Sequence, residues 1–406
     1  MKALVISRFV ALAGIAILQG CGGSAPSGSD GGRVATLKLK ILATGMASPM
    51  QYKSNPVDGE LAYVLERAGR IRLFRKDLLQ RRPVLDIASL VTTSGEGGLL
   101  GMAFDARFAN NRHIYLHYSN GTGVTTVIAR YTMDPSMTSI DTSSARTIIR
   151  ITQPFTNHKG GSINFGQDGF LYVGMGDGGS GNDPSNNAQN PNSLLGKMLR
   201  IDPTGDDFPA DPLTNYSIPT SNPWFSTAGA RKELWAIGVR NPFRWNIDSV
   251  TGALLIADVG QGTMEEVNYE PAGMSGRNYG WRVREGTGAT GLSGNAFNTT
   301  YRNPFFTYLR NSTTGGFSIT GGFFYRGTAL AELTNRYLCA DYVSNNFWAV
   351  PIVLNGSGEA NTTPLASAAR HPFAVTVSGI VSIDPDATGE PILVELNNNR
   401  VSRIVP

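Results

Sequence analysis

The sequence predicts an all-β fold, a six-bladed β-propeller with long loops on the face that carries the site. Glycine accounts for 48 of the 406 residues, about twice its usual share, and charged residues for only 16%. No long stretch repeats its apolar residues with the period of a helix. Short apolar runs bounded by turn residues recur along the chain instead, which indicates many short strands.

The recurring unit is a turn residue followed by an apolar or aromatic run. Six copies fall between residues 37 and 406, and they begin near Leu61, Ile114, Leu171, Leu254, Tyr337 and Ile392. Successive copies begin 53, 57, 83, 83 and 55 residues apart. Repeats of this length are typical of propeller blades. Two β-sandwiches in series are the competing fold, but six nearly even copies without an internal linker favour the propeller.

Two of these spacings are longer, which places insertions at about residues 178–230 and 270–320. Loops at one end of a rigid propeller are a natural position for a functional site. We also expect residues 37–42 to pair with residues 400–405, because closing the ring would remove its exposed strand edges.

The N-terminal segment has the features of a secretion signal. Residues 1–20 contain a positive region and then an apolar run that is too short to span a membrane. The run ends in LQGC, which resembles a bacterial lipobox, so we expect Cys21 to carry lipid and to anchor the exported protein, in the periplasm or at the cell surface. An ordinary signal peptide with an incidental cysteine is the alternative. Residues 21–36 are typical of a flexible tether.

The sequence argues against three other features. Cys339 is the one remaining cysteine and lies in an apolar strand, so we expect it to be buried without a disulfide. The net charge of +4 is small, and no basic cluster is interleaved with aromatic residues, which argues against a nucleic-acid partner. Residues 174–179, GMGDGG, match the spacing of a dinucleotide loop, but such a loop must open a helix, and residues 180–193, SGNDPSNNAQNPNS, cannot begin one cleanly.

The best candidate for a catalytic base is His158, in a glycine-bracketed turn. Residues 163–165 and 170–175 predict two strands joined by a tight QDG turn. Such a hairpin brings the residues before its first strand and after its second strand together, so His158 and Asp177 are expected to lie close. A histidine beside a carboxylate can take a proton from a hydroxyl. The alternative is structural: His158 caps a turn and Asp177 binds loop amides.

Several motifs together resemble the glucose/sorbosone dehydrogenase family, over nearly all of residues 37–406. Members of this family are six-bladed propellers that use pyrroloquinoline quinone (PQQ) to oxidise sugars. The motifs occur in the family's order: GLLGMAF, NHKGG, DGFLYVGMGDGG, NSLLGK, LRIDP, GVRNPFR, DVGQ, NYGW and TGGFFYRG.

The resemblance implies a role for each matching residue. It implies that His158 is the general base, that Asp177 orients it, and that Arg240 lies beside the quinone carbonyl that gains charge, where a fixed planar cation is suited. Four further positions are implied to contact or line the cofactor: Glu96, Asn157, Asn182 and Asn241.

Calcium is also implied by the resemblance. Gly260 and Gln261 match positions whose backbone carbonyls hold the calcium ion that binds the quinone, and calcium prefers such oxygen ligands. Glu266 and Tyr279 resemble a second calcium site, with Tyr279 acting through its carbonyl. Without the resemblance, Glu265 and Glu266 would be interpreted as charges of a surface loop.

The sequence departs from the family where a lysine and an arginine pair hold the quinone's carboxylates. Arg326 is expected to replace the lysine. Residues 375–386, in the region of the arginine pair, contain no arginine. Four other arginines are candidates to replace this pair: Arg277, Arg282, Arg284 and Arg310.

The leading hypothesis is an exported, lipid-anchored dehydrogenase that needs PQQ and calcium and oxidises an aldose sugar at C1 to the lactone. Its electrons would pass to a membrane quinone or a small cytochrome. One alternative is a non-catalytic propeller of the same family that binds carbohydrate or protein. Another is a calcium-dependent hydrolase such as a lactonase, in which Asp177, Asn182 and Asp258 would converge on one metal.

Overall fold

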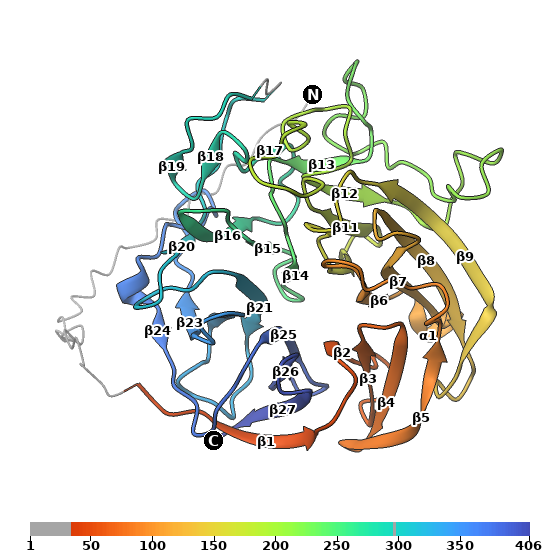
Figure 1. Ribbon diagram of the computed structural model, residues 1–406, viewed down its shortest axis with the longest axis vertical. Helices are drawn as coiled ribbons and strands as arrows, with labels where there is room; N and C mark the ends of the chain where they lie inside the picture. Colours follow the sequence, from red (N-terminus) through yellow and green to blue (C-terminus); the bar gives the residue numbers. More distant parts are fainter. Residues whose placement is uncertain (1–33, 295–297) are drawn as a thin grey trace, which may run out of the picture. The chain divides into compact units, whose positions relative to one another are not determined.

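The computed structural model describes residues 34–294 and 298–406, so the expected signal segment, Cys21 and most of the tether lie outside the described residues. Residues 34–406 form one compact unit, whose six main sheets are arranged in a ring (Figure 1). This confirms the predicted six-bladed β-propeller. The helical segments described are one turn of α-helix, α1 (Phe108–Asn111), and a 3₁₀ turn, η1 (Leu365–Ser367).

Each blade contains four principal strands. The first blade contains β2 (Pro49–Ser54), β3 (Leu61–Glu66), β4 (Arg70–Arg75) and β5 (Leu78–Asp86). The second contains β6 (Leu99–Phe104), β7 (His113–Asn120), β8 (Thr125–Met133) and β9 (Ile140–Thr152). The third contains β10 (Ile163–Phe165), β11 (Leu171–Met175), β12 (Lys197–Ile201) and β13 (Leu234–Ile237).

The remaining blades follow the same plan. The fourth contains β14 (Arg244–Ile247), β15 (Leu254–Asp258), β16 (Met264–Glu270) and β20 (Phe306–Leu309). The fifth contains β21 (Ile319–Tyr325), β22 (Arg336–Asp341), β23 (Phe347–Pro351) and β24 (Ala369–Arg370). The sixth contains β25 (Ile380–Pro385), β26 (Pro391–Glu395), β27 (Arg400–Val405) and β1 (Lys38–Ala43).

The first strands of the blades line the centre of the ring, each in contact with the first strand of the next blade: β2, β6, β10, β14, β21 and β25. The six apolar runs found in the sequence are the second strands. These strands are largely apolar because neighbouring blades cover both of their faces; every residue of β3 and of β11 is buried. Cys339 lies in β22 and is buried as a free thiol, as predicted.

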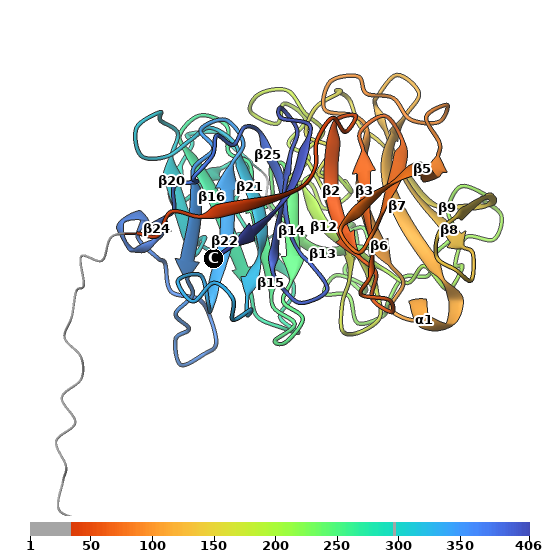
Figure 2. The ribbon, with the colours of Figure 1, turned by 90° about the horizontal axis from the view of Figure 1, so that it is seen from below.

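The ring is closed by the predicted pairing of distant segments. Strand β1 runs antiparallel to β27, with Lys38 opposite Val405 and Ile41 opposite Ser402 (Figure 1). Figure 2 shows β1 crossing the near side of the propeller. Strand β1, which lies at the start of the described residues, therefore completes the blade made by residues 380–405.

The long loops also agree with expectation. They connect β11 to β12, β12 to β13, and β16 to β20. The last of these contains three two-residue strands, β17 (Arg277–Asn278), β18 (Arg284–Glu285) and β19 (Gly288–Ala289). Strand β17 pairs in parallel with β13, so the insertion of blade four is attached to blade three. No helix among the described residues is long and apolar enough to span a membrane.

Candidate active site

A central cavity of about 400 Å³ opens at the end of the ring where the innermost strands begin. Its lining includes a residue at or shortly before the start of each innermost strand: Met50, Glu96, Gly160, Phe243, Thr320 and Val381. The volume falls within the usual range for a small-molecule site. The predicted site residues that line it are Glu96, His158, Arg240, Asn241, Gly260 and Gln261.

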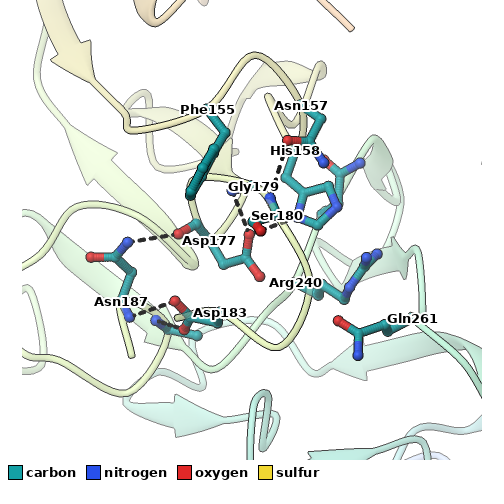
Figure 3. A network of polar contacts seen from close by, with 12 residues as sticks. Phe155, Asn157, His158, Asp177, Gly179, Ser180, Asp183, Asn187, Arg240 and Gln261 are labelled. Carbon is teal, nitrogen blue, oxygen red and sulfur yellow. Dashed lines mark hydrogen bonds and ion pairs between the residues drawn. The ribbon is translucent and has the colours of Figure 1, made fainter. Parts of the chain in front are cut away.

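The His158–Asp177 pair forms as the hairpin predicted. Strands β10 and β11 pair with Phe165 opposite Leu171, and Nδ1 of His158 lies 2.7 Å from Oδ1 of Asp177 (Figure 3). The same oxygen accepts the N–H of Gly179 at 2.9 Å, and Oδ2 accepts the indole N–H of Trp281 at 2.7 Å. Both oxygens of Asp177 act as acceptors in these contacts. Nδ1 of His158 therefore carries the proton, and Nε2 is left as the basic nitrogen.

The backbone that presents His158 is unusual. His158 has a φ of +53°, a left-handed conformation that costs a residue with a Cβ about 1–2 kcal/mol. Its N–H donates to Oε2 of Glu96 at 2.7 Å, which anchors the turn to the segment before β6. A Cβ at Gly176 would lie 2.0 Å from the carbonyl oxygen of His158. The glycines of GMGDGG therefore permit close backbone packing under the histidine.

Arg240 and Asn241 are held by a buried carboxylate. Their backbone N–H groups donate to the two oxygens of Asp258, at 2.8 and 2.6 Å. Burial raises the pKa of Asp258, and these two hydrogen bonds partly offset the effect. Nη1 of Arg240 donates to the carbonyls of Val259 and Gly260, so its guanidinium is fixed at the cavity wall. Asn241 accepts the N–H of Gly160 at 3.0 Å and so joins Arg240's loop to the histidine turn.

The residues fit the expected first calcium ion only in part. Gly260 and Gln261 line the cavity, but the Gly260 carbonyl accepts N–H groups from Arg240 at 2.8 Å and from Arg310 at 3.0 Å. Glu96 is the one carboxylate residue in the lining, and no cluster of three or more His, Cys, Asp or Glu with metal-site geometry occurs among the described residues. Calcium takes about six to eight oxygens. The described residues of the cavity alone therefore supply too few free oxygens to complete a calcium shell.

The second calcium position has one favourable feature. Glu266 lies opposite Asp258 in the pairing of β15 with β16, and both side chains are buried. Burial and the neighbouring Asp258 raise the pKa of Glu266, and a cation beside it would relieve this repulsion. The oxygens of Glu266 already accept N–H groups from Asn268 and Gly286. Tyr279 is buried, and its hydroxyl donates to Glu270 at 2.7 Å.

Three predicted cofactor contacts do not line the cavity. Asn157 accepts the N–H of Ser180 and so shapes the loop after Asp177. Asn182 is exposed and reaches the cavity only through Gln261, whose side-chain oxygen accepts its N–H at 2.5 Å. Arg326 is six residues beyond Thr320 along β21, roughly 20 Å from the cavity end of that strand. There it pairs with Asp248 at 2.5 Å. The expectation that Arg326 replaces the family's lysine is therefore wrong.

Two residues of the site, Trp281 and Arg67, were not predicted from the sequence, and a third, Arg310, was predicted only as one of several alternatives. Trp281 belongs to the NYGW motif, but only the contact with Asp177 reveals its position. Arg67 lines the cavity and donates to the carbonyls of Thr93, Gly95 and Gly97. Arg310 was one of four possible substitutes for the arginine pair, and it is the one that lines the cavity.

Fold and site together define a six-bladed propeller with a cationic central cavity and a histidine–carboxylate pair at its wall. The model of the glucose/sorbosone dehydrogenase family matches residues 46–366, and the chain belongs to that family.

Three proteins illustrate the relationship. HIPL1 protein of Arabidopsis thaliana is 36% identical over 322 residues, which are 66% of this chain and 46% of HIPL1, so the chain spans less than half of that relative. An aldose sugar dehydrogenase of Escherichia coli is 28% identical over 254 residues, 61% of this chain and 62% of the enzyme. The PQQ-bound aldose sugar dehydrogenase of Streptomyces coelicolor shares the fold, with a TM-score of 0.68, 23% identity, and coverage of 91% of this chain and 98% of that one.

Proposed function

We propose that this protein is a PQQ- and calcium-dependent aldose sugar dehydrogenase that oxidises its substrate at C1 to the lactone. The observation that carries the proposal is the oriented His158–Asp177 pair on the wall of a cavity that also exposes guanidinium groups. Family membership supports a sugar dehydrogenase-like quinoprotein. The name of HIPL1 states no activity, so the chemistry proposed for this chain depends on the site.

The proposed role of His158 rests on its hydrogen bond with Asp177. Nε2 of His158 would accept the proton of the sugar's C1 hydroxyl, because Nδ1 is committed to Asp177. Asp177 would stabilise the imidazolium that forms, and its contacts with Gly179 and Trp281 would keep it in place. Glu96 and Asn241 hold the backbone on either side of the histidine.

The cavity's charge suits the proposed cofactor. PQQ is a planar tricarboxylate that, when bound, would accept the hydride from C1. Three arginines, Arg67, Arg240 and Arg310, line the cavity with Glu96 as the one acidic residue. The proposed calcium ion would lie at the carbonyls of Gly260 and Gln261 and would draw further ligands from the cofactor, with a second ion at Glu266 and Tyr279.

The proposal also includes the product, the electron acceptor and the attachment to a membrane. The product would be a lactone, and the electrons would leave to a membrane quinone or a small cytochrome. Export and lipidation at Cys21 would keep the enzyme beside a membrane-bound acceptor. No nucleic acid is involved.

The test is a titration of the purified apo protein with PQQ in the presence of calcium, followed by addition of a panel of aldoses with a reducible dye. We expect calcium-dependent binding, seen in the quinone absorbance, and dye reduction with at least one aldose. His158→Asn should bind the quinone and fail to reduce the dye. Binding without reduction by any aldose would reject the dehydrogenase and favour a carbohydrate- or protein-binding propeller.

A further inference from the structure

One charged residue of the cavity lies just beyond the last strand of blade four. Arg310 follows β20 directly, and its backbone N–H donates to the carbonyl of Thr263 at 2.9 Å. Its guanidinium lines the cavity together with Arg240, and both donate through Nη1 to the same carbonyl, that of Gly260. Two guanidinium groups therefore converge on one point of the wall.

Protein contacts hold the guanidinium of Arg310 in place. Nη1 of Arg310 forms an ion pair with Glu265, a side chain that is fully buried. The other oxygen of Glu265 accepts the N–H groups of Gly260 at 3.1 Å and Ile319 at 2.9 Å. The guanidinium also lies 5.9 Å from the ring of Phe317. A side chain fixed in this way loses little conformational freedom on binding a ligand.

The guanidinium retains unused donors. Within residues 34–294 and 298–406, Nη1 of Arg310 has protein partners, whereas Nε and Nη2 have none. Two adjacent N–H groups of a guanidinium match the two oxygens of a carboxylate. Arg310 can therefore bind a carboxylate without giving up its contacts with Gly260 and Glu265.

The other arginines that could have replaced the family's lysine or arginine pair form contacts outside the cavity. Arg277 pairs with Glu359, and Arg282 donates to the carbonyls of Asn182 and Asp183. Arg284 donates to Thr287 and Asn303, and Arg326 pairs with Asp248. None of these four lines the cavity.

Part of the cavity lining is apolar. The segment where the family's arginine pair was expected contributes Val381, and Met50 and Leu396 lie in the same lining. Arg67 is the cation on the side of blade one, but its Nε and Nη2 already donate to backbone carbonyls. Arg310, on the side of blade four, keeps these two adjacent donors free of the described residues and available for a carboxylate.

We infer that Arg310 replaces the missing arginine pair and anchors a carboxylate of the bound quinone, with the ligand's anionic edge directed at blade four. This inference rests on the proposed function and specifies how this chain achieves it. An arginine that only braced the Gly260 loop would affect stability and not the recognition of carboxylates.

The experiment compares PQQ with its trimethyl ester, which has the same ring system without the charges. Affinities of both compounds are measured by quinone absorbance and by quenching of tryptophan fluorescence, at constant calcium, for the wild type, Arg310→Met and Arg310→Lys. Arg326→Ala is the matched control, because Arg326 is the cavity-remote arginine that the sequence favoured. Thermal midpoints show whether each variant is folded, and Arg310→Lys keeps a cation beside Glu265 if Arg310→Met is unstable.

We expect wild type to prefer PQQ over the ester, and Arg310→Met to bind PQQ about ten- to a hundredfold more weakly with little change for the ester. Arg310→Lys should fall between them, and Arg326→Ala should bind as wild type. Three results would overturn the inference about Arg310 but leave the proposed function intact. They are an equal loss of affinity for PQQ and for the ester in the Arg310 variants, an unchanged affinity for PQQ in these variants, or a loss of affinity in Arg326→Ala. A wild type that binds neither compound would overturn the proposed function with it.

Discussion

The indole N–H of Trp281 donates a hydrogen bond of 2.7 Å to Oδ2 of Asp177, a residue 104 positions earlier in the chain. Trp281 comes from the insertion of blade four, and Asp177 follows β11 of blade three. The same indole lies 5.5 Å from the guanidinium of Arg240. One buried side chain therefore contacts both the carboxylate behind the proposed base and the cation on the cavity wall.

Trp281→Phe should slow turnover without weakening substrate binding. Loss of the N–H leaves Oδ2 of Asp177 without its donor, so the carboxylate and His158 can shift from the productive geometry. We expect kcat to fall about ten- to a hundredfold with KM for the sugar nearly unchanged. Trp235→Phe is the matched control, because it removes an indole N–H that serves Glu270 instead. Equal losses in both variants would indicate a general packing effect.

His158→Asn should abolish proton transfer and leave the fold intact. Asparagine tolerates the left-handed backbone at this position better than alanine does. We expect the rate at which sugar reduces the bound quinone to fall by about 10²–10⁴-fold, with quinone affinity within a few-fold of wild type. Single-turnover absorbance measurements separate the two quantities. Normal quinone reduction would exclude His158 as the base.

Arg240→Lys should impair both binding and rate. The Arg240 guanidinium spans the carbonyls of Val259 and Gly260, and a lysine ammonium cannot reproduce that planar arrangement. We expect quinone affinity and kcat each to fall about tenfold or more, measured by titration and by dye reduction at saturating quinone. An unchanged kcat would remove Arg240 from the chemistry and leave it a binding role.

Calcium and quinone should bind cooperatively. The Gly260 carbonyl and the single lining carboxylate, Glu96, do not complete a calcium shell, so the ion needs the cofactor's oxygens. We expect weak calcium binding to the apo protein, and the factor by which quinone strengthens it should equal the factor by which calcium strengthens quinone binding. Calorimetry in both orders of addition measures the two factors. Quinone affinity that is unaffected by a chelator would contradict the calcium site.

Glu270 should make stability depend on pH. Burial raises the pKa of this carboxyl to about 7, although Tyr279, Trp235 and Arg277 partly offset the effect. The folded state therefore binds the proton more tightly than the unfolded state, so this contribution to stability is complete below about pH 4.5 and is lost as the pH rises through about 7. The free energy of unfolding of wild type, relative to Glu270→Gln, should fall by roughly 1–3 kcal/mol between these values. Urea titrations measure it, and parallel curves for the two proteins would contradict the assignment.

The features that the sequence predicted correctly depend on local rules. Short apolar runs at repeated spacing indicated the blades, and each run proved to be a strand with both faces covered. The His158–Asp177 contact depended on one tight hairpin, whose geometry is fixed by a few neighbouring residues.

The features that it missed depend on which end of a strand faces the cavity and on contacts between blades. Arg326 and Thr320 share one motif, yet the length of β21 separates them and only Thr320 lines the cavity. Arg310 could not be selected from four arginines because its position depends on Glu265 of a neighbouring strand. Trp281 reaches Asp177 only because β17 joins the insertion to blade three.

The pairing of β1 with β27 has a consequence for biosynthesis. In five of the six blades the four principal strands follow one another along the chain, whereas the sixth needs residues 38–43 and 400–405 together. An early segment of the nascent chain must therefore wait, with its strand edge open, until almost the whole propeller has been made. Contacts between residues so distant in sequence form slowly, and an open edge can pair with another chain in the interval. The step most exposed to misassembly should be the last one, when the waiting strand β1 adds to the outer edge of the sixth blade and closes the ring.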